Sequence, residues 1–198
     1  MQEVKTSRSN RERTETTRQA LLDAARALFV DKGYNDTSTP DICAWTATTR
    51  GALYHHFSDK RDLFRHVVLR EAEAVSADIL SATPHGLAPR AALIAGSAAY
   101  LNAMTAPGRT RLLLIDGPAV LGRAELLAMD EENAANTLRE GLLAALTGAD
   151  KVSVNALSSL LSAAFDRAAL DIDGGANAAE VRAALLWLLG KTLAVDCA

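Results

Sequence analysis

The chain has 198 residues, of which 49% are hydrophobic, 23% charged and 5% aromatic, enough apolar material for one large or two small domains. Residues 1–70 hold 12 lysines and arginines against 9 acidic residues, whereas the remaining residues hold 9 against 15, so a basic N-terminal third precedes an acidic remainder. The sequence has no secretory signal and no apolar run long enough to span a membrane, which favours a cytoplasmic protein. It also has no cofactor motif, and its two cysteines, Cys43 and Cys197, lie far apart and match no metal-ligand spacing. We therefore expect neither a cofactor nor a metal.

The chain begins with a polar segment, residues 1–13, that carries Lys5 and three arginines. We expect a disordered basic arm, which either enters a DNA minor groove or serves only as a solubilising tail. The first long helix is expected from about Thr14 to Lys32, because apolar residues recur there at helical spacing. Gly33 is expected to end it as a C-cap.

Residues 39–57, TPDICAWTATTRGALYHHF, have the pattern of two short helices joined by a tight turn. Thr39 is expected to be the N-cap of the first helix, with Pro40 at the first helical position. Ile42 and Trp45 are expected on its apolar side. Residues 46–49 interrupt the helical pattern, and Thr48 or Thr49 is expected to cap the second helix.

The second short helix has two different faces. Leu53 and Phe57 are four residues apart and share the inner face, whereas Arg50 and Tyr54 share an outer face with His55 beside it. An outer face of this kind suits a nucleic-acid groove, because Arg pairs bidentately with guanine and hydroxyl or imidazole groups donate to phosphates or bases. A polar helix face that only contacts solvent is the alternative interpretation.

Residues 18–64 contain short motifs at fixed offsets, which are the Ala-rich first helix ending in Phe29, Lys32-Gly33-Tyr34, Thr37, Asp41-Ile42, Arg50-Gly51, Leu53 to Phe57, Lys60 and Leu63-Phe64. In these motifs the segment resembles the N-terminal domain of the TetR family of bacterial transcriptional regulators. There are two departures from the family pattern. The family usually has Ala-Gly-Val-Ser through the turn, where this chain has TATT at 46–49, and it usually has a small or polar residue at the position of Trp45.

The resemblance implies a DNA-binding repressor that recognises an inverted-repeat operator in double-stranded DNA. Arg50 is then expected to read a base in the major groove, with Thr49 and Gly51 beside it, and Lys60 to lie near a phosphate. A glycine at position 51 has no side chain to keep another molecule away. The residues expected to contact DNA are Thr39, Thr48, Thr49, Arg50, Gly51, Tyr54, His55 and Lys60.

The rest of the chain is expected to be helical as well, with helices over about 58–80, 89–106, 112–115, 123–147, 152–170 and 178–194. Breaks that contain Pro or Gly separate them. The fold predicted is therefore all-α with about nine helices, in which a helix-turn-helix domain at 14–57 precedes an effector-binding and dimerisation domain at 58–198.

The final helix is apolar nearly all round, so it must be covered on more than one side. We expect a two-fold homodimer through the last two helices, which the TetR resemblance also implies; a monomer with a single core is the alternative. The residues expected at the dimer interface are Leu157, Leu161, Phe165, Leu185, Trp187 and Leu188.

The resemblance further implies a small-molecule effector in a cavity among the middle helices. Its binding would shift the long helix that starts near Ser58 and move the two DNA-binding domains out of register with DNA. Mostly apolar candidates with a few hydroxyls and amides favour a hydrophobic molecule with polar groups. The candidates are Tyr100, Met104, Leu113, Asn133, Thr137 and Phe165, each of which is otherwise an ordinary core position.

An enzyme and a helical interaction module are the two alternatives to a regulator. No nucleophile elbow, phosphate-binding loop, zinc-protease or dinucleotide motif is present, so the sequence does not favour an enzyme. A helical interaction module without a role on DNA is the other alternative, but it leaves the basic N-terminal third and the Arg50–Tyr54 face without an explanation.

Overall fold

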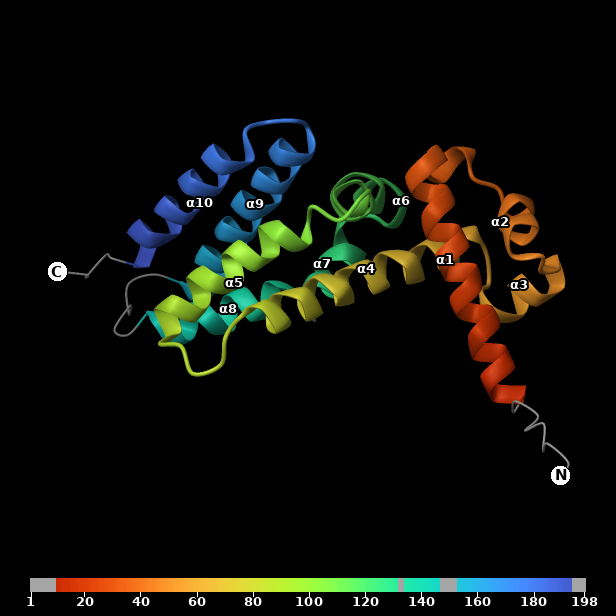
Figure 1. Ribbon diagram of the computed structural model, residues 1–198, viewed down its shortest axis with the longest axis horizontal. Helices are drawn as coiled ribbons and strands as arrows, with labels where there is room; N and C mark the ends of the chain where they lie inside the picture. The colour runs from red at the N-terminus through yellow and green to blue at the C-terminus, as the bar shows by residue number, and fades with distance from the viewer. Residues whose placement is uncertain (1–9, 132–133, 147–152, 194–198) are drawn as a thin grey trace, which may run out of the picture. The chain divides into compact units, whose positions relative to one another are not determined.

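A computed structural model describes residues 10–131, 134–146 and 153–193 (Figure 1). These residues form ten α-helices and one π-helix, and no strand occurs among them. The predicted all-α class is therefore confirmed, with one α-helix more than the nine expected. Among the described helices, none is long and apolar enough to cross a membrane.

The chain divides into two compact units, Met1–Val67 and Val68–Ala198, which we call the head and the body. The division falls inside helix α4 (Lys60–Ala82), which begins in the head and continues into the body. Each unit has its own buried residues and is described separately below.

The head consists of α1 (Asn10–Asp36), α2 (Thr39–Thr46), α3 (Arg50–His56) and the first turns of α4. Helix α1 contacts both α2 and α3. Gly33 interrupts α1 with a φ of 83°, in the left-handed region that favours glycine, so the prediction that Gly33 ends the first long stretch of helix is confirmed. The fully buried large side chains of the head are Leu21, Phe29, Ile42, Leu53, Phe57, Leu63, Phe64 and Val67.

The start of α1 differs from the expectation for the N-terminal arm. Because α1 begins at Asn10, residues 10–13 are helical and do not belong to a disordered arm. Thr16 and Thr17 donate hydroxyl hydrogen bonds to the carbonyls of Glu12 and Arg13, one turn back, at 2.8 and 3.0 Å. The arm residues 1–9 lie outside the described part of the chain.

The body contains the remainder of α4 and seven further elements. They are α5 (Pro89–Ala103), the π-helix η1 (Arg111–Asp116), α6 (Gly117–Leu121), α7 (Arg123–Glu131), α8 (Ala134–Ala145), α9 (Val154–Asp173) and α10 (Ala178–Leu193). Helices α5, α8, α9 and α10 contact one another (Figure 1) and enclose a core that includes Leu101, Leu142, Leu161, Phe165, Leu185 and Leu189. A smaller cluster joins Val75 and Ile79 of α4 to Ala99 and Ala103 of α5, to Met104 at the C-cap of α5 and to Ala169 of α9.

One expected helix boundary in the body was wrong, and one expected helix is only partly described. The helix predicted over 123–147 corresponds to α7 and α8, and only residues 132–133, which lie outside the described part of the chain, separate them. The Asp-Gly-Pro sequence at 116–118, expected to end a short helix, instead lies within a continuous run in which η1 is followed directly by α6. Pro118 lies in the first turn of α6, where a missing N–H does no harm, so this proline starts a helix and does not break one.

Candidate nucleic-acid interface and a cavity in the body

The turn between α2 and α3 keeps a left-handed residue although the chain has no glycine there. Ala47 has φ 51° and ψ 35°, and it is the only non-glycine residue with positive φ in the described part of the chain. Its N–H donates to Ala44 O at 3.3 Å, and Thr48 N donates to Cys43 O at 2.9 Å. The left-handed conformation costs an L-residue about 1–2 kcal/mol, so the surrounding hydrogen bonds hold Ala47 in a strained position.

The cap of α2 is one residue earlier than expected. Ser38, not Thr39, is the N-cap: Asp41 N donates to Ser38 Oγ at 3.3 Å, and Ser38 N donates to Asp41 Oδ2 at 3.1 Å. This reciprocal capping box satisfies two amides at once, and the hydrogen bonds from Ser38 lower the pKa of Asp41. The Thr39 hydroxyl is therefore not needed as a cap and is available for another contact.

That contact joins α2 to α3. The Thr39 Oγ1 and Tyr54 Oη atoms lie 3.4 Å apart, and the Arg50 guanidinium carbon lies 5.9 Å from the centre of the Tyr54 ring. Hydrogen bonds from Thr39 and Arg50 lower the pKa of the Tyr54 phenol. Thr39, Arg50 and Tyr54 form what we call the surface array, a set of polar side chains that hold one another in place before any ligand binds.

Helix α3 presents the surface array because its other face is buried. Thr49 is the N-cap, accepting from Ala52 N at 3.2 Å, and Leu53 is fully buried on the inner side of the helix. Gly51 and His55 are exposed beside Arg50. The predictions that Thr48 or Thr49 caps this helix and that Leu53 and Phe57 point inward are confirmed.

Trp45 is not on the inner face of α2, as expected, but is 65% exposed. Ile42 and Cys43 are the buried residues of this helix. Trp45 lies three residues after Ile42, about 60° away around the helix axis, and on a helix of only eight residues that rotation places it outside the buried stripe.

Lys60 makes contacts inside the head. Its Nζ donates to Tyr34 O at 2.9 Å and Thr37 O at 3.1 Å and lies 4.2 Å from the centre of the Tyr34 ring. These bonds fasten the start of α4 to the corner between α1 and α2. An ammonium has three donors, so one donor remains for the predicted phosphate contact.

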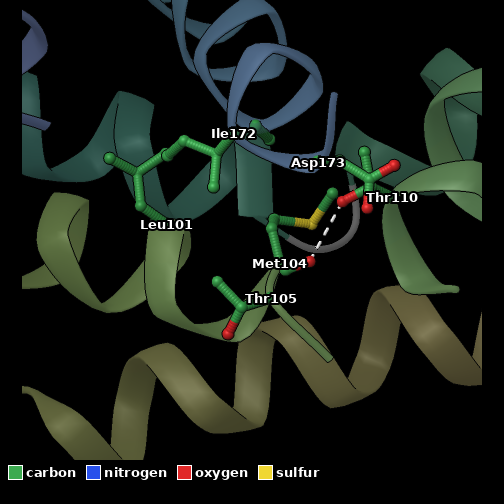
Figure 2. A pocket seen from close by; sticks show the side chains of 7 residues that line it. Leu101, Met104, Thr105, Thr110, Ile172 and Asp173 are labelled. Carbon is green, nitrogen blue, oxygen red and sulfur yellow. Dashed lines mark hydrogen bonds between the residues drawn. The ribbon is translucent and has the colours of Figure 1, made fainter. Parts of the chain in front are cut away.

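The body contains a cavity of about 250 Å³. It lies where α5 and α9 end, and Figure 2 shows the side chains around it. Its lining residues are Leu101, Met104, Thr105, Thr110, Ala169, Ile172 and Asp173. Thr110 Oγ1 donates to Met104 O at 3.0 Å across the segment that follows α5.

Of the six predicted effector contacts, the structure places only Met104 in this cavity. Tyr100 and Phe165 stack edge to face at 5.6 Å, and the Tyr100 hydroxyl donates to Asp166 Oδ1 at 2.8 Å, so both rings belong to the core. Leu113 packs against the smaller cluster, and Thr137 is half-buried on α8. Asn133 lies outside the described residues.

Sequence reasoning missed the other six lining residues, although their positions carried a signal. Thr105 and Thr110 flank Pro107-Gly108, and Asp173 directly precedes Gly174-Gly175. Both the Pro-Gly and the Gly-Gly pair mark the end of a helix. Where two helix ends pack against each other, the side chains of the helices leave some space unfilled.

Next to the cavity, a buried arginine holds α4. Arg109 Nε donates to Glu71 Oε2 at 3.0 Å, and its Nη1 donates to Asp78 Oδ2 at 2.8 Å and Ala103 O at 2.7 Å. The side chains of Arg109 and Glu71 are 10% and 6% exposed. We call the side chains of Arg109, Glu71 and Asp78 the arginine clamp. The clamp connects α4 to the segment between α5 and η1, which also supplies Thr110 to the cavity.

The residues predicted at a dimer interface fall into two groups. Leu161, Phe165 and Leu185 are buried in the core of the body, and Leu157 packs against that core. Trp187 and Leu188 are exposed, Trp187 by 64%. Leu160, which was not predicted, is 72% exposed on α9. The exposed large apolar side chains of α9 and α10, which are Leu160, Trp187 and Leu188, are together called the exposed apolar face below.

The head and the body each match a model of a known protein family. Residues 21–67 match the description "Bacterial regulatory proteins, tetR family", and residues 90–194 match "Tetracyclin repressor-like, C-terminal domain". The HTH-type transcriptional repressor BepR of Brucella suis is 41% identical over 54 residues, 27% of this chain and 26% of that protein. The HTH-type transcriptional regulator AcrR of Shigella flexneri is 41% identical over 61 residues, 31% of this chain and 28% of that protein. The matches thus span only about a quarter of the length of these relatives.

Similarity to solved structures extends over nearly the whole chain. A TetR-family transcriptional regulator from Pectobacterium atrosepticum is 28% identical with a TM-score of 0.68, covering 93% of this chain and 96% of that one. The TetR-like regulator LfrR from Mycobacterium smegmatis, solved in complex with proflavine, is 22% identical with a TM-score of 0.63, covering 89% and 95%. The second similarity concerns the fold alone.

Proposed function

The chain belongs to the tetR family of bacterial regulatory proteins, and on that premise we propose that it is a cytoplasmic, homodimeric repressor released from its operator by a small molecule. Members of the family are transcription factors and not enzymes. The observation that carries the proposal is the surface array of Thr39, Arg50 and Tyr54 on a capped helix-turn-helix.

The surface array supports sequence-specific binding in a major groove. Arg50 donates to the edge of guanine, a bidentate contact that discriminates bases by about 1–3 kcal/mol, and the exposed Gly51 beside it allows close approach of the DNA. Thr48, Thr49 and His55 lie next to Arg50 on or before the same short helix. Thr39, Tyr54, His55 and Lys60 contact phosphates, which fix the position of α3 in the groove without reading sequence.

The exposed apolar face supports a homodimer. A body that leaves Leu160, Trp187 and Leu188 in water gains from covering them, because each buried large apolar side chain contributes about 1.5–3 kcal/mol. A two-fold pair through α9 and α10 presents two copies of α3 to an inverted repeat, with half-sites about 34–36 Å apart or a further helical turn away. Trp187→Glu is expected to give monomers in sedimentation, whereas Leu80→Glu, which changes an exposed leucine of α4, is the matched control.

The arginine clamp supports a route from the effector to DNA. A ligand in the cavity contacts Met104 and Thr110, and Thr110 is adjacent in sequence to the arginine that holds Glu71 and Asp78 on α4. Because α4 begins in the head at Lys60, a change in the clamp acts on the helix that continues into the DNA-binding unit. The ligand shifts the equilibrium between the DNA-binding and the released conformation only by as much as its affinities for these two conformations differ.

The test is selection of binding sites from random duplex DNA with the purified full-length protein at near-physiological salt. Enrichment of an inverted repeat is the expected result, and Arg50→Ala is expected to relax sequence preference within each half-site. An exposed lysine at the end of α1, Lys32, offers the control Lys32→Ala, which removes the same charge outside the surface array. A folded dimer that enriches no sequence would favour a helical interaction module over a repressor.

A further inference from the structure

The cavity between α5 and α9 has chemically different ends. In the view of Figure 2, Leu101 and Ile172 lie toward one side and Thr110 and Asp173 toward the other, with Met104 between them. The apolar side chains suit a hydrocarbon group, and the hydroxyl and carboxylate groups suit a polar one. The cavity is thus matched to a small amphipathic molecule.

The polar end carries negative charge and no positive charge. Asp173 is the only ionisable residue of the lining, and among the described residues it has no salt-bridge partner. Helices α5 and α9 both end at the cavity, and neither has a basic residue in its last turn. A helix C-terminus carries partial negative charge, so both helix ends add to the field of Asp173.

Three arginines lie near the lining in the sequence or by contact, and each has a polar partner. Arg109 is held by two carboxylates and a carbonyl of the body. Arg111, which follows Thr110, pairs with Asp116 at 3.2 Å. Arg182 of α10 donates to Asn102 Oδ1 and, at 3.3 Å, to the carbonyl of the lining residue 101. None of the three guanidinium groups lines the cavity, so a carboxylate or phosphate ligand would meet a carboxylate and no cation from the lining.

The hydroxyl groups complete the polar end. Thr110 uses its own proton in the bond to Met104 O, which leaves its oxygen lone pairs as acceptors. An ammonium has three donors and no acceptor. It therefore matches a site that offers a carboxylate and a threonine oxygen that accepts.

We propose that this cavity binds a small amphipathic amine, with the ammonium at Asp173 and Thr110 and the apolar group between Leu101, Met104 and Ile172. The inference deepens the proposed function, because it names the class of effector, and it rests on that function only for the effect on DNA. A volume of about 250 Å³ equals that of about eight liquid waters, so the ligand is a single ring or a short chain.

The experiment compares three compounds of one shape, phenylpropylamine, phenylpropanol and phenylpropionate, by titration calorimetry with the full-length protein. The amine is expected to bind about three- to fivefold more tightly than the alcohol, the effect of one partly exposed ion pair, and the carboxylate is expected to bind most weakly. Added salt is expected to reduce the preference for the amine. Equal affinities for the three compounds, or no binding of any of them at millimolar concentration, would overturn the proposal.

Two exposed lining residues allow the charge to be changed without disturbing the core. Asp173→Asn is expected to abolish the preference for the amine over the alcohol, and Thr105→Lys to make the carboxylate the tightest of the three. Asp171→Asn is the matched control, because Asp171 is on the same helix, pairs with Arg167 at 2.8 Å and does not line the cavity. A preference for the amine that survives Asp173→Asn unchanged would show that the amine binds elsewhere.

Release of the selected DNA separates this inference from the proposed function. If the amine binds in an Asp173-dependent manner but leaves the protein on its operator, the ligand class stands and release by this effector class is wrong. If a compound releases the operator and its affinity is the same for the wild type and Asp173→Asn, the repressor stands and the amine proposal is wrong.

Discussion

The head and the body use their polar side chains in opposite ways. In the head, Thr39, Arg50 and Tyr54 meet on the surface, and the contact between Thr39 and Tyr54 joins residues 15 apart in the sequence. In the body, Arg109 is buried against a carboxylate 38 residues away. The polar contacts on the surface of the head therefore need only two short neighbouring helices, whereas those of the body exist only after distant helices have packed.

Breaking the arginine clamp is expected to have the largest effect. Arg109→Met removes the guanidinium that pairs with the buried Glu71 carboxylate, and removal of one partner of a buried pair costs about 3–5 kcal/mol. The free energy of unfolding, measured in urea, is expected to fall by that amount, with the loss of hydrogen-exchange protection concentrated in the body.

The control for this prediction is Arg111→Met. Arg111 Nε lies 3.2 Å from Asp116 Oδ2, but its side chain is 42% exposed, so the loss is expected to stay within about 1 kcal/mol. Equal losses for the two variants would mean that burial of the clamp contributes nothing beyond an ordinary ion pair.

Breaking the surface array is expected to act on DNA binding and not on folding. Arg50→Ala removes the proposed groove contact and is expected to weaken operator binding by about 1–3 kcal/mol. The free energy of unfolding in urea is expected to change by no more than about 0.5 kcal/mol, as for other exposed positions. Fluorescence anisotropy with the selected operator and with a scrambled duplex measures the loss of discrimination. An unchanged ratio of the two affinities would move base recognition away from Arg50.

The head was predictable because its signals are short-range. Thr49, Leu53 and Phe57 occupy the predicted cap and inner face, since the spacing of four residues fixes their directions on a helix. The errors in the head are small. Ser38 caps α2 in place of Thr39, because Asp41 forms a capping box with Ser38. Trp45 is rotated about the helix axis to a position just outside the buried stripe. A helix of two turns contains too few residues to fix its inner face by periodicity alone.

The helices of the body were predictable from the sequence, but the lining of its cavity was not. Tyr100 and Phe165 have the side chains of a ligand-binding pocket, yet they contact each other and Asp166 in the core. The cavity is instead formed where α5 and α9 end, and which helix ends meet depends on packing between distant parts of the chain. Neither the partners of Arg109 nor the exposure of Leu160 follows from spacing within one helix.

The left-handed Ala47 in the turn between α2 and α3 offers a smaller test of strain in the head. Ala47→Gly removes a side chain from a left-handed position, which relieves about 1–2 kcal/mol and is partly offset by the greater freedom of glycine in the unfolded chain. A net stabilisation of about 0.5–1 kcal/mol in urea unfolding is expected. Ala44→Gly, at an exposed position in helix α2, is the matched control and is expected to destabilise by about 1 kcal/mol. Stabilisation by both substitutions, or by neither, would contradict strain at Ala47.

The smallest expected effects concern pH, and they have opposite signs in the two units. In the head, burial lowers the pKa of His56 below its ordinary 6.5, with His55 and Arg18 acting in the same direction and Glu15 opposing. The unfolded chain then binds this proton more tightly than the folded head, so stability is lost as pH falls below about 6.5. His56→Gln is expected to reduce that loss in urea midpoints measured from about pH 7.5 to about pH 5, and His85→Gln, in the loop after α4, is the control.

In the body, the stability contributed by Asp166 has the opposite dependence on pH. Burial raises the pKa of this carboxyl above its ordinary 3.8, and the hydrogen bond from the Tyr100 hydroxyl opposes that rise. The folded body therefore holds the proton more tightly than the unfolded chain, so this group's contribution to stability falls as pH rises through the raised pKa and stays reduced at neutral pH. Asp166→Asn keeps an oxygen acceptor for Tyr100 without the buried charge. It is expected to raise the melting temperature at neutral pH, with the advantage disappearing below about pH 3.8, whereas Asp171→Asn, at an exposed ion pair, should show no such advantage. A lower melting temperature for Asp166→Asn at neutral pH would mean that the charged acceptor of Tyr100 stabilises the body by more than its burial costs, and the contrast in pH response between head and body would then disappear.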